Sequence, residues 1–273
     1  MVLVPERMGV AISTADGEAV TQWRQDQYRE LKWTREKSQV SRCDLTVPFR
    51  PGPRIVQWWH WASVWDMDAP RRNGPLWRGP VVGVERDDDT MTLSARDVGV
   101  FGQKTRTPIT KRWDGEYPAT IAAELWNRML DMRGYDTRMM VNQDPLGDPF
   151  DFDVKQNEKK LNQVFDELVK LGLMWTVVGG TPVLGPMPLE PVAVLNRNHL
   201  AEHDFKLVQD GSTMCNDLVV RGADDLHRAS MPLPGGVILQ ETLNLDDVFG
   251  VSNLIKASKQ FLREHMIPRE TVV

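Results

Sequence analysis

Residues 76–97 are the stretch that most narrowly limits the fold, and they read LWRGPVVGVERDDDTMTLSARD. Two short apolar runs stand on either side of three consecutive aspartates. In the second run Met91, Leu93 and Ala95 alternate with polar residues, which is the period of a strand with one buried face. The stretch therefore predicts a β-hairpin that turns through residues 86–89 and packs one face against a core.

Other segments before residue 116 are also typical of strands. The segment at 31–49 alternates from Val40 onward and ends in a proline-rich stretch. The segment RIVQWWHWASVWDM at 54–67 is rich in β-branched and aromatic residues, as expected for a long, half-buried strand. Residues 1–115 are therefore predicted to form a first, mainly β domain.

The pattern changes to a helical one near residue 116. A helix is predicted in YPATIAAELWNRMLDMRGY at 117–135, with Pro118 near its start and Gly134 at its stop. Its apolar residues at helical spacing are Ile121, Leu125, Met129 and Met132. A second helix, in NEKKLNQVFDELVKLGL at 157–173, has an apolar face and ends at Gly172. The members of that face are Leu161, Val164, Phe165, Leu168 and Leu171. A hairpin turning through Gly179 and Gly180 follows, so that residues 116–192 are predicted to be a small α+β module.

Strands return in the last part of the chain, residues 193–273. Leu218, Val219 and Val220 form a short apolar run that ends at Gly222, and GGVILQETLNL at 235–245 is predicted to be extended. NLIKASKQFLREHMIP at 253–268 predicts a C-terminal helix. The fold class is therefore α+β.

Composition restricts the function classes. The chain has 273 residues, 41% hydrophobic and 26% charged, which is ordinary for a globular protein. A net charge of −5 argues against a protein that grips nucleic acid over its whole surface. Cys43 and Cys215 have no motif spacing, and no apolar run has the length of a signal peptide or a membrane span. We therefore expect the protein to be made in the cytoplasm.

One segment of the sequence is a candidate for binding a metal ion. His199 and His203 in HLAEHDF stand four residues apart, and Asp204 follows them. A helix could direct these side chains at one metal ion. However, the glutamate of the zinc-protease motif is missing and no third ligand has a recognisable spacing. We predict loop residues here, and no metal site.

Other catalytic patterns are equally weak. Two acids on either side of a cleft can hydrolyse a glycosidic bond, but the acidic pairs here occur mostly in turn-like contexts, where short acids cap the backbone. These pairs are Asp66 and Asp68, Asp151 and Asp153, Asp224 and Asp225, and Asp246 and Asp247. The segment GGTPVLG at 179–185 lacks the lysine of a phosphate-binding loop. No enzyme and no cofactor is predicted.

Two further clusters of residues indicate binding surfaces instead of catalytic sites. The basic segment KTRTPITKR at 104–112 could line a path for DNA by contacting phosphates, or it could be a solvated loop. Its cations are Lys104, Arg106, Lys111 and Arg112. The stretch WWHWASVW at 58–65 holds four of the ten tryptophans, and such a concentration of rings builds a wall or an interface. These are Trp58, Trp59, Trp61 and Trp65.

The order of several motifs resembles the tail hub proteins of long-tailed bacteriophages. The order is a tryptophan, a glycine, two short strands, an aspartate and then an arginine, here Trp77, Gly79, Asp97 and Arg106. The two-helix module and the strand NDLVVRG, from Asn216 to Gly222, follow in the family's order. The resemblance is to the amino-terminal hub module of tail-associated lysins, of the kind found in actinobacteriophages, and it covers most of the chain.

This resemblance implies a fold and a function. Residues 1–115 and 193–273 would each be a small β-barrel-like domain, with 116–192 as the insertion between them. Three copies would form a ring that closes the tail tube and opens for DNA. The partners implied are a second and third copy, the distal tail protein, the tape measure protein and other minor tail proteins, in the tail tip or baseplate of the virion. Asp97 would then be structural, either capping the backbone after its strand or pairing with Arg106.

Two alternatives stay open at this point. Many relatives continue into a hydrolase or fibre domain, whereas this sequence stops at RETVV, so it is either a minimal hub or one that has lost its end. The second reading of the function is a tail enzyme or module that binds the cell envelope or degrades peptidoglycan. It would use the aromatic cluster at 58–65 to stack sugars.

Overall fold

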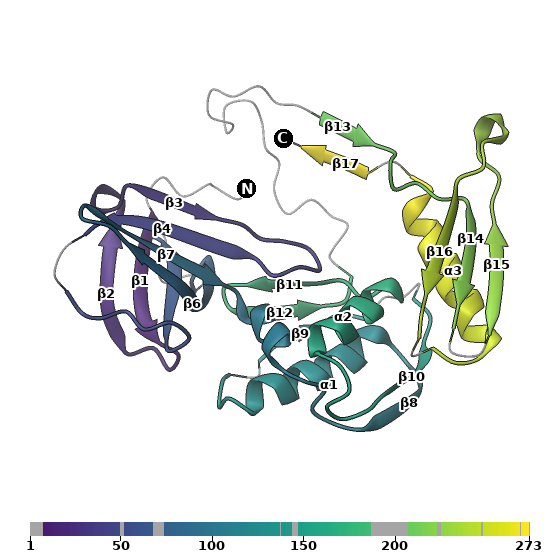
Figure 1. Cartoon of the computed structure of the whole chain (residues 1–273), viewed down its shortest axis with the longest axis horizontal. Helices are drawn as coiled ribbons and strands as arrows, with labels where there is room; N and C mark the ends of the chain where they lie inside the picture. The colour runs from purple at the N-terminus through teal and green to yellow at the C-terminus, as the bar shows by residue number, and fades with distance from the viewer. Residues whose placement is uncertain are drawn as a thin grey trace.

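The computed structural model describes residues 8–49, 52–67, 74–136, 138–143, 147–186, 207–222, 225–246, 248–267 and 269–272. Figure 1 shows the chain from its N-terminal sheet, in purple, through the helical module in teal to the C-terminal part in yellow. Among these residues, no helix combines the length and the apolar character needed to span a membrane.

The first part of the chain forms a single seven-stranded sheet (Figure 1). Its strands lie in the order β2-β1-β5-β6-β7-β4-β3, and all neighbours are antiparallel. Their bounds are β1 (Met8–Thr14), β2 (Ala19–Arg24), β3 (Glu30–Trp33), β4 (Arg42–Pro48), β5 (His60–Asp66), β6 (Trp77–Arg86) and β7 (Thr90–Arg96).

The central strand β6 belongs to both halves of this sheet. Its residues from Trp77 to Pro80 pair with β5, whereas those from Val81 to Arg86 pair with β7. The register shifts between Val81 and Gly83, as a β-bulge does. Side chains from both halves enclose one core, which includes Val10, Leu45 and Val64.

The hairpin predicted at 76–97 is confirmed. Met91, Leu93 and Ala95 are buried in this core, while the residues between them are half-buried. The turn is held by Asp87, whose carboxylate accepts hydrogen bonds from the backbone N–H groups of Asp89 and Thr90. At least one of the three aspartates, Asp87, therefore stabilises the turn, which is a common role of aspartate in turns.

The strand predicted over 54–67 is shorter than expected, because it begins only at His60. Residues 57–59 form a turn in which Trp58 has a φ of 66°. The turn is closed at its base, where the backbone N–H of His60 donates to Val56 O and the N–H of Val56 donates to Nδ1 of His60. Composition alone does not reveal a turn made of residues that favour strands.

The helical module has its own core. It contains β8 (Lys111–Glu116), α1 (Pro118–Asp131), β9 (Met140–Val141), β10 (Phe150–Val154), α2 (Leu161–Lys170), β11 (Trp175–Val178) and β12 (Thr181–Leu184), preceded by the 3-10 helix η2 (Val98–Lys104). Trp126 is fully buried at its centre, stacked on Phe165 and edge-on to Trp175. The turn of the β11–β12 hairpin uses Gly179 and Gly180, both at positive φ as predicted.

Both helices of the module are confirmed, with differences at their ends. The apolar face of α2 is buried as predicted, and Gly172 follows it at a φ of 99°. Helix α1 ends at Asp131, one residue before Met132. Met132 was predicted on the apolar face but is 66% exposed, because it occupies the cap position beyond the last buried turn.

The C-terminal part contains two small sheets and a helix. Strands β15 (Leu226–Ser230), β14 (Asp217–Arg221) and β16 (Gln240–Asn244) form one sheet, and β13 (Leu207–Asp210) pairs with β17 (Arg269–Val272) in the other. The predicted C-terminal helix is confirmed as α3 (Val251–His265), which packs on β14 and β15. This part joins the core of the helical module through Leu218, Val220 and Leu254.

The α+β class is confirmed, and the finer architecture stays a prediction. In the described residues the first sheet ends at β2 on one side and β3 on the other, so that a closed barrel is not formed by hydrogen bonds there. The predicted boundary at 115 also stays a prediction. Residues of η2 and of β8 contribute to the core of the helical module.

Candidate functional site

Two of the predicted motif residues, Gly79 and Asp97, meet where β6 passes the end of β7, and we call this place the β6–β7 junction. It comprises Gly79, Arg96, Asp97 and Ser41. A Cβ atom on Gly79 would lie 1.9 Å from the carbonyl oxygen of Arg96 and 2.8 Å from Cα of Asp97. The two backbones approach so closely that only glycine fits at this position of β6.

Asp97 caps the backbone from inside the junction. Its side chain accepts hydrogen bonds from the N–H of Ser41 at 2.7 Å and from the N–H of Gly99 at 2.8 Å. The residue is only 1% exposed and is the N-cap of η2. Of the two roles expected for Asp97, the structure shows the capping role. No ion pair between Asp97 and Arg106 occurs among the described residues. The backbone of Arg106 forms an isolated antiparallel β-bridge with that of Lys160.

The buried carboxylate has a shifted pKa. Burial raises the pKa of Asp97 to about 6, the hydrogen bonds from Ser41 and Gly99 oppose that rise, and the charge of Glu36 adds to it. A folded-state pKa above the unfolded one means that the folded chain binds this proton more tightly. The charged carboxylate therefore destabilises the folded chain above pH 6, and protonation relieves this cost as the pH falls towards 4.

Lowering the pH from 7 to 5 should therefore stabilise the wild-type chain relative to an Asp97→Asn variant by about 1 kcal/mol. Urea unfolding of both proteins at the two pH values measures the difference. Other carboxylates are common to both, including Asp217, whose pKa is lowered to about 2 by hydrogen bonds from Arg228 and Gln240. Parallel pH dependence in the two proteins would contradict the shift.

The tryptophans predicted as an interface divide between core and surface. Trp61 is 5% exposed and packs against Phe101 and Tyr135 at 6.1 and 5.1 Å between ring centroids. It belongs to the core of the helical module, although it lies on β5 of the first sheet. Trp77 is also buried, whereas Trp65 is half-buried.

The exposed rings lie in the turn before β5, and we call Val56–Trp59 the aromatic turn. Trp59 is 66% exposed, and Val56 and Trp58 are 39% and 37% exposed. A hydrogen bond joins the turn to β6, because the N–H of Trp58 donates to Val81 O at 2.7 Å. Lys104 lies 5.9 Å from the Trp58 ring centroid. The aromatic turn therefore exposes apolar side chains on a backbone that is hydrogen-bonded to β6.

The basic residues proposed for a DNA path do not form one free positive patch. Lys111 pairs with Glu124 at 2.6 Å, and Arg112 pairs with Asp114 at 2.7 Å. Lys104 and Arg106 are exposed and form no ion pair within the described part of the chain. Two of the four cations thus already have carboxylate partners, and the DNA path stays a prediction.

Asn216 and Gly222, the motif residues of the C-terminal part, lie where other segments of the backbone come close to β14. The side-chain amide of Asn216 donates to Met231 O at 2.9 Å and to Val237 O at 3.1 Å, and its oxygen accepts from the N–H of Leu239 at 2.7 Å. Gly222 ends β14 where a Cβ atom would lie 2.7 Å from Val248 O. Both residues therefore have structural roles, Asn216 directly before β14 and Gly222 directly after it.

A candidate metal site is not assembled in the described residues. No cluster of three or more potential metal ligands occurs among them. His199, His203 and Asp204 lie outside the described residues, as do Asp68, Asp224 and Asp247. Asp151 has a structural role, because it accepts from the N–H of Gly115 and from the side chain of Asn253.

Known structures with the same architecture include three tail proteins. The tail protein of Neisseria meningitidis MC58 superposes with a TM-score of 0.64 at 13% identity, over 94% of this chain and 76% of that one. Prophage tail protein gp18 of Listeria monocytogenes EGD-e gives 0.62 at 10% identity, over 96% and 79%. The 43 kDa tail protein of prophage MuSo2 from Shewanella oneidensis gives 0.58 at 14% identity, over 95% and 79%.

The chain has the tail-protein fold. No family model matches the chain, and no curated protein matches its sequence. The likeness therefore rests on the arrangement of the elements, which at 10–14% identity persists without recognisable sequence similarity. The resemblance read from the motif order is supported for the fold, while the hub type stays a prediction.

Proposed function

We propose that this protein is a structural hub subunit at the tail tip of a long-tailed bacteriophage. Three copies form a ring that closes the tail tube, joins the distal tail protein to the tip proteins, and opens for DNA. The observation that carries the proposal is the tail-protein fold, which spans 94–96% of the chain in three separate comparisons.

Two features of the chain support an assembly role. The aromatic turn holds Trp59 in a fixed, exposed position, and exposed aromatic residues are enriched in the centres of protein interfaces. The first sheet ends in two outer strands, β2 and β3, whose outer edges pair with no further strand among the described residues, and such edges can form contacts between subunits. The motif residues Gly79, Asp97, Asn216 and Gly222 are occupied in shaping the backbone, as suits a scaffold.

The partners follow from this role. The protein would contact other copies of itself, the distal tail protein, the tape measure protein and further minor tail proteins. It would be assembled in the host cytoplasm and then remain in the virion. DNA would pass through the ring without sequence-specific contacts.

Electron microscopy of the purified protein and of intact tails tests the proposal. We expect a closed threefold ring around a central channel at the tail tip. A protein that stays monomeric and is absent from virions would exclude the hub role. Clearing of a suspension of host cell walls by the purified protein would favour the envelope-degrading alternative.

The aromatic turn gives a sharper version of this test. A Trp59→Ser variant should keep the unfolding temperature of the wild-type monomer, because the ring is mostly in solvent, but should form fewer rings at the same concentration. Ile267→Ser is the matched control, since Ile267 is 70% exposed and lies far along the chain. Equal loss of rings in both variants would show that the aromatic turn has no special part in assembly.

A further inference from the structure

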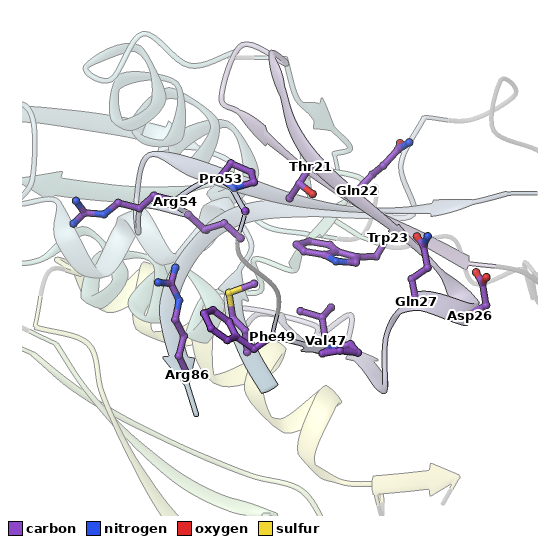
Figure 2. A pocket seen from close by; sticks show the side chains of 14 residues that line it. Thr21, Gln22, Trp23, Asp26, Gln27, Val47, Phe49, Pro53, Arg54 and Arg86 are labelled. Carbon is purple, nitrogen blue, oxygen red and sulfur yellow. The ribbon is translucent and has the colours of Figure 1, made fainter. Parts of the chain in front are cut away.

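A cavity of about 810 Å³ opens in the first sheet between β2, the ends of β4 and β6, and residues 52–55 (Figure 2). Its floor is apolar, because Val47, Ile55 and Met91 are members of the sheet's core. Its rim carries polar and charged side chains. Neither the β6–β7 junction nor the aromatic turn contributes to its lining.

The cavity runs along the free edge of β2. Thr21, Gln22 and Trp23 all line it, although successive residues of a strand point to opposite faces of a sheet. Thr21 and Trp23 are half-buried and Gln22 is exposed, so the lining includes residues from both faces of β2, at the margin of the sheet. Strand β2 pairs with β1 on its other side and is the last strand of the sheet.

The main chain along this edge is unpaired. Within the part of the chain that the structure describes, residues 21–23 form no backbone hydrogen bonds beyond those to β1. An extended polypeptide beside β2 could therefore form the missing main-chain bonds, which is how peptides add to the edges of sheets. The Trp23 ring lies within the cavity in Figure 2, where it could pack on an apolar side chain of such a peptide.

The charged residues that line the cavity indicate the charge of the peptide that would bind there. In the view of Figure 2 the side chains of Arg54 and Arg86 are both on the left of the cavity, and Asp26 is on the right. Both arginines are exposed, and the side chain of neither has an ion-pair or hydrogen-bond partner among the described residues. Two arginines and one aspartate give the lining a charge of +1, whereas the chain as a whole carries −5.

We propose that this cavity binds an extended, acidic segment of a partner polypeptide, which adds to β2 as an eighth strand. A carboxylate of the segment is held by Arg54 and Arg86, and a neighbouring apolar side chain lies over Trp23 and the floor. An anionic sugar chain could use the arginines, but it would leave the strand edge and the apolar floor unused. The proposal does not depend on a threefold ring.

Selection of a library of random ten-residue peptides on the immobilised full chain tests this site. We expect the selected peptides to carry Asp or Glu alternating with β-branched or aromatic residues. Binding should weaken at least tenfold in an Arg54→Glu/Arg86→Glu variant, and also when alternate peptide nitrogens are methylated. The amides of residues 21–23 that face away from β1 should become protected from hydrogen exchange on binding.

A matched variant separates the site from overall charge. Lys32→Glu/Arg42→Glu makes the same change of charge at exposed positions of the same sheet, on β3 and β4, that do not line the cavity, and it should bind as wild type does. The proposal is overturned if no acidic peptides are enriched, if both double variants lose binding equally, or if methylated peptides bind as well as unmodified ones. Oligogalacturonate binding more tightly than the selected peptides would also overturn it.

Discussion

A Gly79→Ala variant should lose about 3 kcal/mol or more of its free energy of unfolding, or fail to fold. The added methyl group would overlap the carbonyl of Arg96, at 1.9 Å. That carbonyl cannot easily move, because Arg96 is paired with Arg42 of β4 and the N–H of Asp97 donates to Ser41 O. Urea unfolding followed by circular dichroism measures the loss.

Gly83→Ala is the matched control for this variant. It lies four residues further along β6, and its added Cβ would meet Ser94 Cβ at 3.5 Å, an ordinary contact. Its free energy of unfolding should stay within about 1 kcal/mol of wild type, because alanine costs a strand no more than glycine does. If the two variants unfold at the same urea concentration, the close approach at the β6–β7 junction does not constrain the chain.

Asn216→Ala should cost about 3 kcal/mol, because it removes three hydrogen bonds from a residue that is 4% exposed. The carbonyls of Met231 and Val237 and the N–H of Leu239 would lose their partner. The segment between β15 and β16 would then lose its fixed ends, and amides from 231 to 239 should exchange faster. Urea unfolding and hydrogen exchange measure the two effects.

Asn244→Ala provides the comparison. Asn244 is exposed on β16, and its side chain makes no hydrogen bond among the described residues. This variant should stay within about 0.5 kcal/mol of wild type. An equal, small loss in both variants would mean that the side chain of Asn216 does not hold the segment in place.

Local patterns predicted those elements whose stability is decided by their own residues. The alternation in 90–96 and the apolar face of 161–171 each reflect one buried side, so they could be read directly. The glycine pair at 179–180 specified its turn for the same reason. Strand β15 (Leu226–Ser230) was missed, because it has no buried residue and its positions alternate only between exposed and half-buried.

Features made by distant residues could not be predicted in this way. Nothing near Trp61 in the sequence shows that its ring enters the core of the helical module while Trp59 stays in solvent. The motif order marked Gly79 and Asp97, but their proximity depends on how β6 passes β7. The cavity beside β2 depends on Arg54 and Arg86, which are far apart in the sequence and belong to no recognisable pattern.

The strand order of the first sheet also determines when its strands can pair during synthesis on the ribosome. The hairpins β1–β2 and β3–β4 are synthesised first, yet each pairs with a strand of the later β5–β6–β7 meander, β1 with β5 and β4 with β7. The β1–β2 hairpin therefore waits for its partner until residue 66 has left the exit tunnel, and the β3–β4 hairpin waits until residue 96 has done so. During that interval the nascent chain exposes apolar strands, and its yield in a cell will depend on how quickly the meander follows or on a chaperone that shields them.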